Sequence, residues 1–74
     1  MSYGDAGGLL ELEGEIAKQK QRVEDQEVLI SVLEHDGHDV SEQEAALRVE
    51  RASLALKIVQ QIKLMASNSS NVLA

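Results

Sequence analysis

The sequence predicts an all-α protein, an antiparallel two-helix hairpin that dimerises into a four-helix bundle. Apolar residues recur at every third or fourth position over two long stretches. Turn-forming residues interrupt this pattern once in the middle, and Gly-rich or polar segments bound it at both ends. The chain has no Pro, Cys, Trp or Phe, whereas a β-sandwich or barrel usually contains aromatics and regularly spaced turns. We therefore expect a flexible arm over residues 1–8, a helical hairpin over 9–66 and a flexible polar tail over 67–74.

The first helix is expected over residues 9–36. The segment before it contains three glycines and few side chains to bury, which is typical of a mobile arm. The helix has an a/d heptad pattern, and the seam consists of Leu9, Leu12, Ile16, Gln19, Val23, Gln26, Ile30 and Leu33. Two of these positions are Gln, and Arg51 and Gln61 are polar at facing positions of the second helix. Such residues either fix register and partner orientation, or lie at the edge of the contact with their long side chains reaching solvent.

The turn is expected over residues 37–41, where the helical pattern stops and starts again. Gly37 suits the left-handed position that follows a helix C-terminus. Ser41 is followed three residues later by Glu44, which is the spacing of a capping box. In that motif the Ser hydroxyl accepts from the Glu amide and the carboxylate reaches back. The second helix is therefore expected to begin near Glu42.

The second helix is expected over residues 42–66, before a segment rich in Ser and Asn. Its apolar residues cover more than half of its circumference, which is wider than one partner helix can bury. One stripe contains Leu47, Leu54 and Ile58, and in an antiparallel register Leu47 lies opposite Ile30 and Ile58 opposite Gln19. A second stripe runs through Ala45, Val49, Ala52, Leu56 and Val59. One stripe should face the first helix and the other a second chain, but the sequence does not decide which.

A hairpin of this size needs a further source of stability. It has neither a disulfide nor a thiolate metal site, because Cys is absent, so oligomerisation is the stabilising device left to it. We expect a homo-oligomer, with a dimer favoured, and we keep another helical protein as an alternative partner. The predicted interface lies on the second helix and consists of Leu47, Val49, Ala52, Leu54, Leu56, Ile58, Val59, Ile62 and Met65.

Charge and hydropathy exclude several classes of function. The net charge is −6, and no basic face is available to displace the counterions of a nucleic acid. The longest apolar run is three residues, which is far too short to span a membrane. The N-terminus does not resemble a signal peptide. Together with the absence of Cys, these features predict a cytoplasmic protein without nucleic-acid or membrane partners.

The sequence predicts neither a catalytic site nor a cofactor or metal. The acidic residues of the first helix resemble a solvated helix face more than a catalytic pair, which would need a cavity. A cluster at the turn, His35, Asp36, His38 and Asp39, has the chemistry of metal ligands. The favoured interpretation is that His35 complements the helix C-terminus while the two Asp residues shape the turn. We therefore predict a non-enzymatic interaction module. The alternative is a small ligand- or metal-responsive regulator that uses this turn.

The turn and the helix before it also resemble a known family. The segment from Ile16-Ala17-Lys18-Gln19 through Leu33-Glu34-His35-Asp36-Gly37-His38-Asp39-Val40 resembles short, uncharacterised bacterial proteins, mostly alphaproteobacterial. They share a helix that ends in a Leu-Glu-x-Asp-Gly-His-Asp-Thr type of turn before a second helix. The resemblance covers roughly residues 15–65, and Val40 stands where the family usually has Thr. It implies a helical hairpin of bacterial origin and carries no assigned activity.

Overall fold

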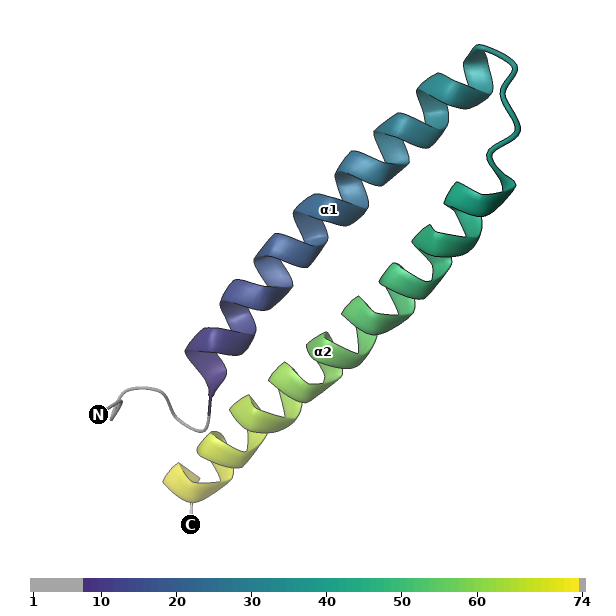
Figure 1. Ribbon diagram of the computed structural model, residues 1–74. Helices are drawn as coiled ribbons and strands as arrows, with labels where there is room; N and C mark the ends of the chain where they lie inside the picture. Colours follow the sequence, from purple (N-terminus) through teal and green to yellow (C-terminus); the bar gives the residue numbers. More distant parts are fainter. Residues whose placement is uncertain (1–7, 74) are drawn as a thin grey trace.

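The protein is a hairpin of two long antiparallel helices, α1 (Leu9–His35) and α2 (Ser41–Leu73), which lie side by side along most of their length (Figure 1). The computed structural model describes residues 8–73 and measures 57 × 22 × 14 Å. No strand occurs in that range. The predicted all-α hairpin is confirmed, and neither described helix is long and apolar enough to cross a membrane. The predicted arm lies outside the described residues except for Gly8.

The second helix is longer than predicted. It begins at Ser41 and continues through the expected tail to Leu73, so the prediction of a flexible tail from residue 67 is wrong as far as residue 73; Ala74 lies outside the described residues. Ser and Asn are poor helix formers, but each costs only about 0.5 kcal/mol relative to Ala. Because neither Gly nor Pro follows Ala66, nothing in this segment breaks the helix.

The C-terminus of α1 closes as a Schellman motif. Gly37 has a φ of 86°, the left-handed conformation that the sequence predicted for it. Its amide donates to the Glu34 carbonyl at 3.0 Å, and the His38 amide donates to the Leu33 carbonyl at 2.9 Å. These two bonds satisfy carbonyls that would otherwise lack a partner at the helix end. The helix therefore stops at His35, one residue before the predicted end.

The start of α2 differs from the predicted capping box. The Ser41 hydroxyl donates to the Asp39 carboxylate at 2.6 Å, and the Ser41 amide donates to the same oxygen at 3.0 Å. The Glu44 amide donates instead to the Val40 carbonyl at 2.8 Å. A carboxylate accepts these bonds better than a hydroxyl does, so Asp39 takes the capping role that the sequence pattern assigned to Ser41.

The core lies at the turn end of the hairpin. Val23 and Ile30 of α1 pack with Val40 and Leu47, and Leu33 and Leu54 lie against this cluster. Farther from the turn, α1 buries Leu12, Ile16 and Gln19. Of the two stripes on α2, the one that contains Leu47, Leu54 and Ile58 therefore faces α1.

Candidate interaction surface

Away from the turn, the side of α2 that faces α1 mixes polar and apolar residues. The residues partly covered there are Glu50, Ser53, Leu54, Lys57, Ile58, Gln61 and Leu64. The polar members of this set lie beside α1, where long polar side chains of the two helices bond to one another across the contact.

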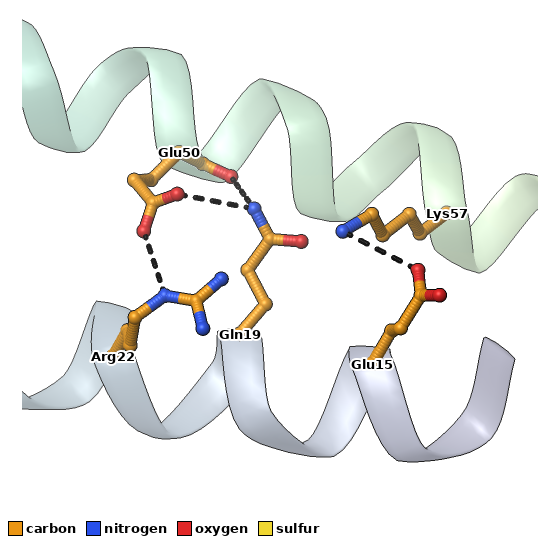
Figure 2. Close-up of polar contacts among 5 residues, drawn as sticks. All are labelled: Glu15, Gln19, Arg22, Glu50 and Lys57. Carbon is orange, nitrogen blue, oxygen red and sulfur yellow. Dashed lines mark hydrogen bonds and ion pairs between the residues drawn. The ribbon is translucent and has the colours of Figure 1, made fainter. Parts of the chain in front are cut away.

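The centre of this polar contact is Gln19. Its amide nitrogen donates to the Glu50 backbone carbonyl at 3.3 Å and to the Glu50 carboxylate at 3.2 Å, and Figure 2 shows the amide turned toward Glu50. The side chain is 2% exposed, and its Oε1 atom accepts no hydrogen bond within the described residues. These bonds join Gln19 to Glu50, whereas the position of Ile58 opposite Gln19 stays a prediction. Because the amide nitrogen of Gln19 is hydrogen-bonded and its oxygen is not, this side chain fixes the relative position of the two helices more than it stabilises their contact.

Ion pairs and hydrogen bonds flank Gln19 along the rest of the contact. Arg22 joins Glu50 at 3.4 Å, and Lys57 joins Glu15 at 3.7 Å (Figure 2). Arg51, which was predicted at the seam, pairs with Glu27, and Gln61 donates to Glu13 at 3.5 Å. One partner of each ion pair is more than half exposed, so each pair contributes at most about 1 kcal/mol. Their role is mainly to orient α2.

The second apolar stripe of α2 faces solvent. Leu56 is 72% exposed and Val49 is 70% exposed. Leu56 follows Leu47 by nine residues (56 − 47), and nine steps of about 100° lead to the opposite side of the helix. The other exposed members of the predicted interface are Ala52, Val59, Ile62 and Met65. Leu47 is buried, and Leu54 and Ile58 are partly buried, so these three belong to the contact between α1 and α2.

The structure also exposes apolar residues that the sequence analysis did not select. They lie on α1 and are Leu10, Val28, Leu29 and Val32. Three of them are recognisable in the sequence as apolar residues next to the heptad positions. Val28 and Leu29 directly precede Ile30, and Val32 directly precedes Leu33. All three lie outside the a/d positions, and they cluster at the turn end of α1.

The His/Asp turn forms no metal cage in the structure. Within the described residues, no group of three or more His, Cys, Asp or Glu side chains is placed to hold a metal ion. The pKa of Asp39 is lowered, first by the hydrogen bond from the Ser41 hydroxyl and then by that from the Ser41 amide. Asp39 is therefore engaged in capping α2. A ligand-responsive turn stays a prediction, which a calorimetric titration with zinc would test.

Comparisons with known proteins return no match among protein-family models, curated proteins or solved structures. The resemblance of the turn to the bacterial hairpin family therefore stays a prediction.

Proposed function

We propose that this chain is a non-enzymatic self-association module whose copies meet through the exposed apolar side of α2. The observation that supports it is the orientation of α2. Its half away from the turn presents Glu50, Lys57 and Gln61 to α1 and leaves Leu56 and Val59 in solvent. Leu54 and Ile58 of the same half lie against α1, so one apolar stripe is covered by α1 and the second is left for a second chain to cover.

The energy available at this surface is substantial for so small a protein. Each fully buried aliphatic side chain contributes about 1.5–3 kcal/mol, and Val49, Leu56, Val59, Ile62 and Met65 are all at least 47% exposed in the single hairpin. The contact between α1 and α2 is narrow and partly polar. Burial against a second copy would therefore supply stability that the hairpin lacks alone.

We place this module in the cytoplasm, because a chain without Cys has no need of an oxidising compartment. An amphipathic helix of another protein is an alternative partner for the same apolar surface of α2, and it would compete with the second copy.

Sedimentation and circular dichroism of three variants test the proposal. Leu56→Glu places a charge on the exposed apolar side, and Gln21→Glu adds the same charge to the exposed polar side of α1. Val23→Glu disturbs the contact between the helices, where Val23 is buried. We expect the parent to be associated at micromolar concentration, Leu56→Glu to dissociate, and Gln21→Glu to behave like the parent.

The helical content of dissociated Leu56→Glu shows whether the single hairpin stays folded or unfolds. If Leu56→Glu dissociates and loses helix together, folding and association are one transition. Val23→Glu should lose helix whether or not it associates, because it introduces a charge into the hairpin itself. A parent that is monomeric, fully helical and cooperatively melting would refute the proposal, as would a Leu56→Glu variant as associated as the parent.

A further inference from the structure

We propose that the second copy docks antiparallel, with α2 against α2 of the partner, about a two-fold axis between Leu56 and Val59. This inference rests on the proposed self-association and specifies its geometry. It is carried by one line of exposed positions on α2, which we call the outer seam: Ala45, Val49, Ala52, Leu56, Val59, Lys63 and Ala66.

The spacing of the outer seam is that of a coiled coil. Its positions are separated alternately by four and three residues from Ala45 to Ala66, which is an a/d heptad pattern. All seven side chains are exposed in the hairpin. α1 offers no comparable line, because Gln21 and Asp25 interrupt its outward side between Leu10 and Val28. The continuous seam is therefore on α2.

The charge on the outer seam selects the direction of pairing. Lys63 is its one charged position. In a parallel pair each Lys63 would face the partner's Lys63, so like charges would repel. In an antiparallel pair the two Lys63 residues lie at opposite ends of the interface and do not face each other.

The sizes of the side chains favour one antiparallel register. When facing positions sum to 115, Leu56 faces the partner's Val59, and Ala52 faces the partner's Lys63. Val49 then faces the partner's Ala66. Near each end of the interface an Ala thus lies opposite a larger side chain, Ala52 opposite Lys63 and Ala66 opposite Val49. Such alternation of small and large residues lets the side chains of two helices interdigitate. The Lys63 stem can cross the partner's Ala52 while its ammonium group reaches solvent.

Distances between spin labels measure the direction of pairing. Because the chain has no Cys, one introduced Cys at Arg48 or at Gln60 gives a single labelled site per copy. In the antiparallel pair Arg48 lies level with the partner's Ser67, so at 1.5 Å per residue the two labels at position 48 are about 30 Å apart. Labels at position 60 lie near the axis and should be less than about 20 Å apart. A parallel pair would give short distances at both sites, which would overturn the inference.

A charge exchange at the facing pair provides an independent measurement. Ala52→Glu places a carboxylate opposite the partner's Lys63 in the antiparallel pair, so association should persist. In the double variant Ala52→Glu/Lys63→Glu, acids face acids, and the dissociation constant should rise at least about tenfold. A parallel pair would bring the two introduced carboxylates at position 52 together, so Ala52→Glu alone would dissociate it. That result would refute the antiparallel register.

The two proposals fail in different ways. A parent chain that sediments as a monomer contradicts self-association itself. A parent that associates, but with a short distance between labels at position 48 or with dissociation by Ala52→Glu alone, contradicts only the antiparallel pairing.

Discussion

The Gln19 amide bonds both the backbone carbonyl and the carboxylate of Glu50, which places a fully buried polar group between the two helices. The same side chain keeps an unpartnered Oε1 atom within the described residues. This relationship ties the two helices together at one level along their axes. The unpartnered oxygen also destabilises the folded hairpin, because a buried acceptor without a donor costs roughly 1–3 kcal/mol.

We predict that Gln19→Leu stabilises the hairpin by about 1 kcal/mol, because it removes the cost of the unpartnered buried oxygen. Glu50 keeps its ion pair with Arg22 in this variant. Gln19→Ala should instead destabilise by about 1–2 kcal/mol, because it leaves a cavity without restoring apolar contact. Urea unfolding at one fixed protein concentration measures both. A Gln19→Leu variant less stable than the parent would show that the two bonds to Glu50 outweigh the unpartnered oxygen.

The cap of α2 should depend on Asp39 more than on Ser41. Asp39→Ala removes the acceptor of two hydrogen bonds, whereas Ser41→Ala removes one of them and keeps the bond from the Ser41 amide. We therefore expect a larger fall in melting temperature for Asp39→Ala than for Ser41→Ala. Glu44→Ala serves as the control for the capping box and should lower the melting temperature less than Asp39→Ala. The opposite order would indicate that the Ser41–Glu44 box forms in solution.

The stabilising effect of Asp39 should vanish in acid. Its pKa in the folded protein is lowered from 3.8, so the ionised carboxylate stabilises the folded state fully above the unfolded pKa. That contribution is lost as the pH falls through the lower, folded pKa. The difference in melting temperature between the parent and Asp39→Asn should be constant above about pH 5 and close toward pH 2. A difference that persists at the lowest pH would show that the charge of Asp39 is not its source.

The hairpin was predictable because its signals are local. The heptad of α1 identified its buried residues, and Gly37 identified the turn through its left-handed conformation. The start of α2 was less predictable because two overlapping patterns compete there. Asp39 lies two residues before Ser41, and the structure uses the Asx-type bond in place of the capping box.

The orientation of α2 could not be predicted from periodicity. Its apolar arc is so wide that two stripes could face α1 with similar hydrophobic gain. In the structure the stripe with Leu47 and Leu54 packs against α1. Long-range polar contacts accompany it, among them Gln19 with Glu50 and Glu15 with Lys57. Such contacts join residues from different helices, and their partners become visible only when both helices are placed.

Substitution of two glycines by Ala should shift stability in opposite directions. Gly14 lies inside α1, and a Cβ atom built there meets nothing within 4 Å, so Gly14→Ala should stabilise by about 1 kcal/mol through helix propensity. At Gly37 a Cβ also meets nothing within 4 Å, but φ is +86°. Gly37→Ala should therefore destabilise by about 1–2 kcal/mol through backbone strain alone.

Urea unfolding of both variants at equal protein concentration separates these two effects, because association contributes equally to each. Gly37→Asn is the matched control, since Asn tolerates the left-handed conformation better than Ala and should lose less stability. An unchanged stability for Gly14→Ala would mean that the first turns of α1 are frayed in solution. If Gly37→Ala were as stable as the parent, the helix end would not adopt the Schellman motif that joins Gly37 to Glu34.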